Sequence, residues 1–156
     1  MKFSAQEEYA LRCLISIARF YSIKEGLTIP EISRREGISE HTVAKTLRQL
    51  RLGGFLDSER GQSGGYSLSN PPEEIKIRDV LLSLGGKLYD DEFCLSHSGV
   101  NGLCSNTTDC SIRSLWRIIQ DAVDKVTEGL TLNDLLGKEN DVFVKLNFDS
   151  VESDGN

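Results

Sequence analysis

Apolar residues recur at helical spacing through the start of the chain. Between residues 4 and 23 they fall three and four positions apart, which predicts an amphipathic helix that Gly26 ends. Thr28 and Glu31 then have the spacing of a capping box, and they start a second, shorter helix that Gly37 stops. The chain is therefore expected to open with two helices.

A third helix follows and has two distinct faces. Ser39 is placed to cap it, and Val43, Leu47 and Leu50 share the face that we expect in the core, up to about Leu52. A short helix, a turn with glycine and a second helix have the spacing of a helix-turn-helix. The polar positions carry side chains that bind phosphates and base edges in DNA, namely Ser39, His41, Thr42, Lys45, Arg48 and Gln49. An ordinary solvated helix face is the alternative.

Two short segments after the third helix predict a β-hairpin. Residues 55–60 and 66–68 are the expected strands, and the glycine-rich stretch 61–65 is the expected loop, so the unit is a winged helix. Arg60 at the base of the wing is placed to enter a minor groove, and Gln62 completes the expected DNA-contacting set. A phosphate-binding loop is disfavoured because the stretch lacks the G-K-[ST] ending.

The second half of the chain predicts two more helices and a tail. Residues 73–84 predict a short amphipathic helix, and residues 112–130 predict a long one whose apolar stripe includes Leu115, Ile118 and Val126. In so small a protein this stripe needs a partner, and we favour a second copy of the chain over the front domain. Residues 131–136 predict one or two further helical turns, and the acidic tail 137–156 is expected to be mostly disordered.

The expected fold class is therefore mainly α with a small β-hairpin wing. Residues 1–70 would form the winged helix-turn-helix domain. Residues 71–136 would supply the connecting helix, a loop at 90–111 and the dimerisation helix at 112–130.

Charge separates the two halves of the 156-residue chain. Residues 1–70 carry 10 Lys and Arg against 8 Asp and Glu, whereas residues 71–156 carry 8 against 16, so the net charge of −6 hides a mildly basic front half. Two halves so different in charge suggest different tasks. The chain has no run of 18 apolar residues and no apolar signal sequence, so we expect a cytoplasmic protein without a membrane partner.

Three cysteines crowd into one polar stretch with the spacing C-x9-C-x5-C. Cys94, Cys104 and Cys110 lie among Gly, Ser, Asn and Thr, directly before the long helix. Cytosolic thiols stay reduced, and three thiolates on one loop suit a metal or iron–sulfur centre. Zinc and metal-free thiols remain alternatives. Cys13 differs, because it falls in the apolar pattern of the first helix and is expected to be a buried hydrophobe.

An enzyme is not expected, and no catalytic residue is assigned. The chain has two histidines, His41 and His97, and neither belongs to a recognisable catalytic arrangement with a nucleophile or carboxylates. One other class of protein could use the three cysteines. A small electron-transfer or cluster-carrier protein would leave the polar helix face and the wing unexplained, so a DNA-binding regulator is favoured.

Together these features resemble the Rrf-two family of bacterial winged-helix regulators. The resemblance covers residues 1 to about 136 and rests on the triple cysteine, the long helix after it, and the motifs Tyr9-Ala-Leu-Arg12, Glu31-Ile32-Ser33, Gly37-Ile38-Ser39, Leu47-Arg48-Gln49-Leu50, Arg60-Gly61 and Gly64-Gly65-Tyr66-Ser67-Leu68. It implies a homodimeric bacterial transcription factor that binds a double-stranded DNA operator. It also implies an iron–sulfur cluster, for which we prefer 2Fe–2S over 4Fe–4S, with Cys94, Cys104 and Cys110 as ligands.

The chain departs from the family pattern in three places. The gap between Cys94 and Cys104 is longer than expected, Arg113 stands where some members have a ligating His, and Ala44 stands where some have a Glu in the recognition helix. A fourth ligand must then come from elsewhere. Some members use an acidic residue of the other subunit four positions before the first-helix Arg, which implies Glu8 here; the alternatives are His97, Glu7, Asp109, Thr107 or a hydroxide. The signal, such as cluster status, redox state or nitric oxide, stays open.

Overall fold

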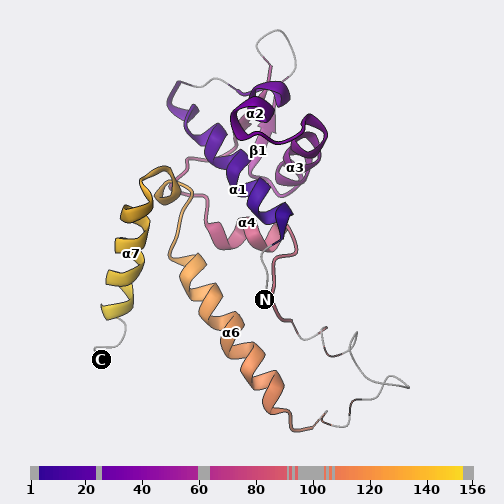
Figure 1. The fold of residues 1–156 in the computed structure, drawn as a ribbon, viewed down its shortest axis with the longest axis vertical. Coiled ribbons are helices and arrows are strands. Elements are labelled where there is room, and N and C mark those ends of the chain that lie inside the picture. The colour runs from indigo at the N-terminus through magenta and orange to yellow at the C-terminus, as the bar shows by residue number, and fades with distance from the viewer. Residues whose placement is uncertain are drawn as a thin grey trace.

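The structure is a computed structural model, and it describes residues 4–23, 26–59, 64–90, 92, 94, 104, 106 and 108–152. Within these ranges the chain is mainly helical with one antiparallel hairpin, as the sequence predicted (Figure 1). Its elements in chain order are α1 (Ala5–Ala18), η1 (Tyr21–Ile23), α2 (Ile29–Glu36), α3 (Glu40–Leu52), β1 (Leu56–Ser58), β2 (Tyr66–Leu68), α4 (Ile77–Ser83), α6 (Ser111–Glu128), η3 (Asp134–Leu136) and α7 (Glu139–Glu152).

The capping residues place the first three helices. Thr28 and Glu31 form the predicted capping box of α2, in which the Glu31 carboxylate accepts hydrogen bonds from the Thr28 hydroxyl at 2.7 Å and from its backbone N–H at 2.8 Å. These two hydrogen bonds lower the pKa of Glu31. Gly37 ends α2 with a φ of +65°, a left-handed conformation that glycine adopts without strain. Ser39 then caps α3 by accepting from the backbone N–H of Thr42.

The core of the front domain lies where α1, α2, α3 and the hairpin meet. Val43, Leu47 and Leu50 are fully buried, which confirms the predicted inner face of α3. Leu14 of α1 and Ile32 of α2 are also fully buried against them in the same cluster. These side chains fix the recognition helix on the rest of the domain, because burial of each stabilises the fold by roughly 1.5–3 kcal/mol.

The hairpin is attached to the segment before α2. β1 and β2 pair with Leu56 opposite Leu68 and Ser58 opposite Tyr66. Tyr66 also exchanges backbone hydrogen bonds of 2.8 and 2.9 Å with Leu27, so a third short stretch of backbone joins the sheet. Gly65 allows this approach, since a Cβ there would lie 2.7 Å from the carbonyl carbon of Gly26.

The helix α4 is shorter than the predicted range 73–84. Tertiary hydrogen bonds hold the residues before it in extended backbone, because Ile75 and Ile77 bond to the segment that follows α6: Leu132 N–H to Ile75 C=O at 2.8 Å and Ile77 N–H to Leu130 C=O at 3.0 Å. The helix therefore begins at Ile77 and not at residue 73. It ends before Gly85, whose φ is +83°.

The helix α6 extends away from the winged-helix body, and α4 lies between the two (Figure 1). The chain then returns to the body through η3, which confirms the predicted turn within 131–136. The tail differs from the expected disorder, because α7 covers Glu139–Glu152. Lys145 pairs with Asp134 at 2.7 Å, and Val142 packs against the core, so contacts outside the helix hold its first half.

Candidate nucleic-acid interface and cysteine segment

The outer face of α3 presents the predicted DNA-contacting side chains. His41, Lys45 and Arg48 are exposed, and Thr42 and Gln49 are half-buried, so all five reach the surface of one helix. A helix with this surface fits a major groove, where Arg, Lys and Gln read phosphates and base edges. The solvated-face alternative is weakened by the hairpin that follows it, as a winged helix requires.

Ser39, one of the predicted DNA-contacting residues, also has a structural role as the N-cap of α3. Its hydroxyl lies 2.8 Å from the Thr42 hydroxyl and accepts from the Thr42 backbone N–H at 3.2 Å, so it caps the helix that carries the other contacts. Arg60 and Gln62, the predicted wing contacts, lie outside the described residues and stay predictions.

The recognition helix is joined to the wing by a residue that the sequence analysis missed. Arg51, in the last turn of α3, donates a hydrogen bond of 3.2 Å to the hydroxyl of Ser58 at the end of β1. This contact links the last turn of α3 to the end of the first strand of the hairpin. Sequence periodicity could not single out Arg51, because an exposed Arg in the last turn of a helix is a common favourable choice.

Cys13 is separate from the other cysteines. It is fully buried in α1, as predicted, and burial together with the nearby Glu36 carboxylate raises the pKa of its thiol to about 12. A thiol in this state is neither a good nucleophile nor a ready metal ligand.

Alkylation of the folded, reduced protein should therefore divide the four cysteines into two classes. We expect Cys94, Cys104 and Cys110 to react with N-ethylmaleimide at least about tenfold faster than Cys13. The reagent attacks only the thiolate form of a cysteine, and only where it can reach the sulfur. Peptide mass spectrometry over time measures the four rates. Denatured protein is the control, in which Cys13 should react as the others do; equal rates in the folded protein would contradict the burial of Cys13.

The three remaining cysteines form no disulfide and lie in different surroundings. Cys94 is half-buried with its sulfur 3.5 Å from the Tyr89 hydroxyl, and Cys104 is exposed. Cys110 is the N-cap residue of α6, and its sulfur accepts from the backbone N–H of Arg113 at 3.4 Å.

The donor chemistry fits an iron–sulfur group, but the geometry of one chain does not assemble the site. Among the described residues, no three His, Cys, Asp or Glu side chains lie close enough together to hold a metal ion. Glu8 is exposed on the first turn of α1, and Glu7 is engaged in the capping box of Ser4. His97 and Thr107 lie outside the described residues. Sulfur donors are thus present on one segment, without a gathered ligand set.

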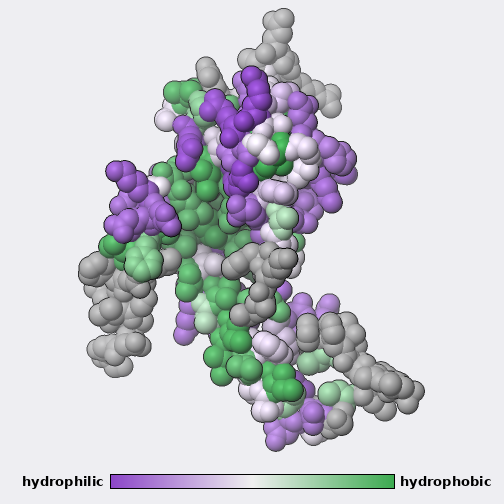
Figure 2. All heavy atoms as spheres, viewed as in Figure 1, coloured by the Kyte–Doolittle hydropathy of each residue, from purple (hydrophilic) through white to green (hydrophobic). Residues whose placement is uncertain are grey.

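The helix α6 leaves hydrophobic side chains in solvent. Ile112, Leu115, Ile118 and Val126 are each at least half exposed, and together they form what we call the α6 apolar face. Figure 2 shows hydrophobic surface running along α6 toward the body of the molecule. An apolar face of this kind on a small protein marks an interaction site. The sequence predicted this apolar stripe.

A helix-turn-helix followed by a two-stranded hairpin, with the second helix exposed along its polar side, defines a winged-helix DNA-binding protein. The family model for Rrf2, described as an iron-dependent transcriptional regulator, matches residues 3–138. The chain therefore belongs to the Rrf2 family of transcriptional regulators, which are not enzymes.

Relatives and solved structures agree with this membership. The protein rrf2 of Nitratidesulfovibrio vulgaris is 29% identical over 136 residues, covering 87% of each chain. The regulator IscR of Aliivibrio salmonicida is 27% identical over 87% of this chain and 77% of its own length. CymR, the global cysteine regulator of B. subtilis, superposes with a TM-score of 0.70 at 27% identity, over 87% of this chain and 96% of that one. IscR of T. potens gives a TM-score of 0.69 at 25% identity, over 87% and 86%.

In the part of the chain that the structure describes, no helix is both long and apolar enough to cross a membrane.

Proposed function

We propose that this protein is a transcriptional regulator whose binding to an operator is controlled by the state of Cys94, Cys104 and Cys110. One observation carries the proposal: three cysteines outside any disulfide sit on the segment that leads directly into α6, and Cys110 itself caps that helix. Any chemistry at these sulfur atoms acts at the start of the helix that extends from the DNA-binding domain.

The favoured chemistry is an iron–sulfur cluster held by Cys94, Cys104 and Cys110. Thiolates are the usual ligands of such clusters, and the family model is described as iron-dependent. When bound, the cluster would supply a redox-active, sulfur-rich centre whose gain or loss changes the shape of the segment. The 2Fe–2S form is the first to test. A fourth ligand from Glu8 of the partner subunit would join two chains, and the described residues of one chain do not gather a ligand set by themselves.

DNA recognition would use the exposed face of α3 in two copies. A homodimer presents two recognition helices to two half-sites, and a small change in their separation decides whether both fit the duplex. The α6 apolar face supports this arrangement, since a second copy of the same face is the simplest complementary surface. The acidic second half of the chain would then lie away from the phosphates.

A regulator that uses its thiols without metal is the second candidate. It is favoured by the separate surroundings of Cys94, Cys104 and Cys110, which would let each react alone. One structural neighbour, at 25% identity and a TM-score of 0.66, is an oxidised form of the Staphylococcus aureus regulator CymR. In this case a thiolate would attack hydrogen peroxide and break its O–O bond, giving sulfenic acid and a hydroxide ion that takes up a proton from solvent to become water. An electron-transfer protein would have no use for the exposed face of α3.

Spectra and DNA-binding measurements on the anaerobically isolated protein distinguish the two candidates. For the cluster, we expect visible absorption with stoichiometric iron and sulfide, all lost in a variant with Cys94, Cys104 and Cys110 replaced by serine. We further expect affinity for the protein's own promoter fragment to change by about tenfold or more in that variant, because a regulatory coupling has this size.

Cys13→Ala is the matched control and should keep the colour and the affinity. A colourless, iron-free wild type whose affinity still responds to peroxide would support the thiol candidate. A wild type whose affinity is unchanged by the triple substitution would end both candidates. Glu8→Ala with an unaltered spectrum and cluster lifetime would remove Glu8 from the ligand set.

A further inference from the structure

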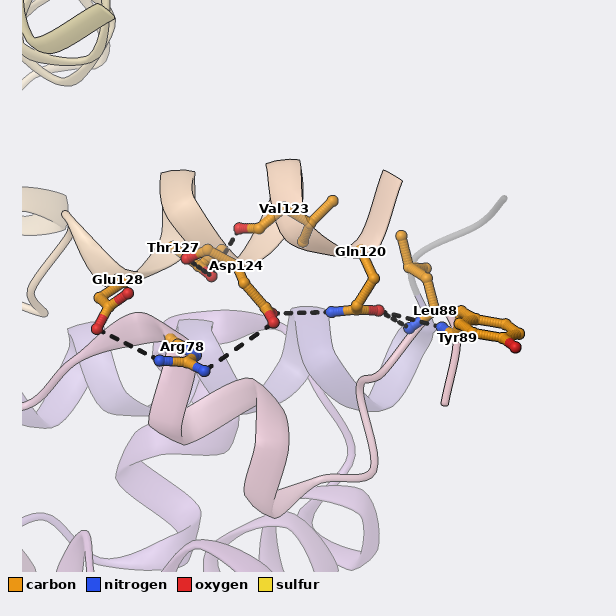
Figure 3. Close-up of polar contacts among 8 residues, drawn as sticks. All are labelled: Arg78, Leu88, Tyr89, Gln120, Val123, Asp124, Thr127 and Glu128. Carbon is orange, nitrogen blue, oxygen red and sulfur yellow. Dashed lines mark hydrogen bonds and ion pairs between the residues drawn. The ribbon is translucent and has the colours of Figure 1, made fainter. Parts of the chain in front are cut away.

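The segment that leads into the cysteines is tied to α6 by one side chain. Gln120 is buried, at 8% exposure, on a helix whose other described residues are all more exposed. Its amide oxygen accepts from the backbone N–H groups of Leu88 at 2.8 Å and Tyr89 at 3.1 Å (Figure 3). The Tyr89 hydroxyl in turn lies 3.5 Å from the sulfur of Cys94. Gln120 therefore holds the backbone five to six residues before the first cysteine.

The same amide continues toward α4. The amide nitrogen of Gln120 donates to Asp124 at 2.8 Å, one helical turn further along α6. Asp124 lies 4.0 Å from a terminal nitrogen of Arg78 on α4, and the other terminal nitrogen of Arg78 lies 3.3 Å from Glu128. Because residues four apart share a face of a helix, Gln120, Asp124 and Glu128 line the side of α6 that faces α4 (Figure 3).

The helix α4 passes this attachment on to the DNA-binding domain. Ile77 and Val80 of α4 are buried in the same core cluster as the inner face of α3. At the end of α4, the Leu84 carbonyl accepts from the Gln6 side chain of α1 at 3.4 Å. A movement of α6 on α4 is thus a movement of α6 on the winged helix.

The contact at Arg78 is strong enough to orient α6 and weak enough to break. Its distance to Asp124 is at the limit of an ion pair, and its Nε is buried without a hydrogen-bond partner among the described residues. A guanidinium in this state gains from any rearrangement that satisfies the remaining N–H. Arg78 therefore keeps one N–H that a rearrangement of α6 on α4 could satisfy.

We infer that Gln120, Asp124 and Arg78 are positioning residues that transmit the state of the cysteine segment to the DNA-binding domain. The inference rests on the proposed function, in that the state of the cysteines is the signal. A change in the cysteine segment that shifts residues 88 and 89 would break the two hydrogen bonds to Gln120. Asp124, which accepts from the Gln120 amide, would then shift as well. The pairing with Arg78 then sets the angle of α6 on α4, which sets the separation of two recognition helices in a dimer.

The choice of glutamine is specific to this role. An amide offers an acceptor to the two backbone N–H groups and a donor to Asp124 at the same time. Glutamate in its place would repel Asp124, and methionine of similar length would satisfy neither side. Packing alone would be served equally well by an apolar residue.

The first test concerns Cys94 and needs neither DNA nor cluster. In the reduced full-length protein, Gln120→Met should raise the iodoacetamide alkylation rate of Cys94 by about fivefold, since loss of a hydrogen bond changes a local equilibrium by that factor. The rate of Cys104 in the same molecule is the internal control and should stay within a factor of two of wild type, roughly the scatter of independent sites. An unchanged Cys94 rate would overturn the inference.

The second test measures the coupling itself. The ratio of promoter-fragment dissociation constants, before and after alkylation of the thiols with iodoacetamide, should fall from about fivefold or more in wild type to near one in Asp124→Asn and Arg78→Met. Asp121→Asn removes the same charge from an exposed position of α6 and should keep the wild-type ratio. A wild-type ratio in Asp124→Asn would overturn the inference. A ratio near one already in wild type would refute the proposed function and the relay together, whereas the first test would still show whether Gln120 positions Cys94.

Discussion

With the proposed α6 dimer, an Ile118→Asp variant should be a monomer at concentrations where the wild-type chain dimerises, and it should lose its operator affinity with the dimer. Ile118 is 66% exposed, the largest exposed fraction in the α6 apolar face. Burying an isoleucine contributes roughly 1.5–3 kcal/mol, and a symmetric interface counts the change twice. The dimer dissociation constant should therefore rise on the order of 1,000-fold.

Analytical ultracentrifugation of both proteins measures the oligomeric state, and fluorescence anisotropy measures affinity for the promoter fragment. Lys138→Gln is the matched control, because it changes the net charge by the same one unit from an exposed position outside α6. The control should remain dimeric. An Ile118→Asp protein that dimerises as the wild type does would place the interface on another surface and remove the argument from α6.

A Gly65→Ala variant should lose the correct seating of the wing. The added Cβ would lie 2.7 Å from the carbonyl carbon of Gly26 and 2.9 Å from that of Leu27, both of them backbone atoms that cannot rotate away. Forcing such a contact costs roughly 1–3 kcal/mol, which corresponds to a melting temperature lower by about 3–10 °C. Operator binding should weaken beyond the loss of stability, since the strand that starts at Tyr66 carries the wing.

Gly129→Ala is the control for Gly65→Ala. Its Cβ would meet its nearest neighbours at 3.7 Å, an ordinary contact distance, and its backbone is already right-handed. Differential scanning calorimetry and anisotropy should find Gly129→Ala close to wild type in both stability and binding. If Gly65→Ala melts and binds as the control does, the backbone contact between Gly26 and Gly65 does not hold the wing.

The helices of the front domain were predictable because their signals are local. The Thr28 and Glu31 pair, the Gly37 stop and the Ser39 cap all act within one turn of helix, and each has the predicted role in the structure. The buried face of α3 followed from its periodicity in the same way. The hairpin was found from its glycine-rich loop, but its backbone bridge to Leu27 joins residues far apart in sequence and has no local signal.

The regions that sequence analysis misjudged depend on distant contacts. The start of α4 is delayed because Ile75 and Ile77 bond to residues 130 and 132, and no pattern within 73–84 announces that pairing. The helix α7 has acidic residues in its first turn, which favour a helix start, but its apolar residues follow no clear stripe. Its ion pair between Lys145 and Asp134 spans two elements.

The candidate site was also predictable only where its signals are local in the sequence. Spacing identified Cys94, Cys104 and Cys110 and separated them from Cys13, whose burial the structure confirms. The sequence could not show that, in one chain, the three cysteines do not gather into a metal-binding group. Gln120 was overlooked for a related reason, since a glutamine in an amphipathic helix is ordinarily a solvent-facing residue, and only the approach of residues 88 and 89 makes it a buried one.

The backbone bridge between Leu27 and Tyr66 restricts where a regulatory motion can occur. Because it fastens the hairpin to the segment that starts α2, the helix-turn-helix and the wing should exchange amide hydrogens as one cooperative unit. A signal that reaches this unit is therefore expected to rotate it as a rigid body and not to deform it. Specificity for base sequence and response to the signal can then evolve independently.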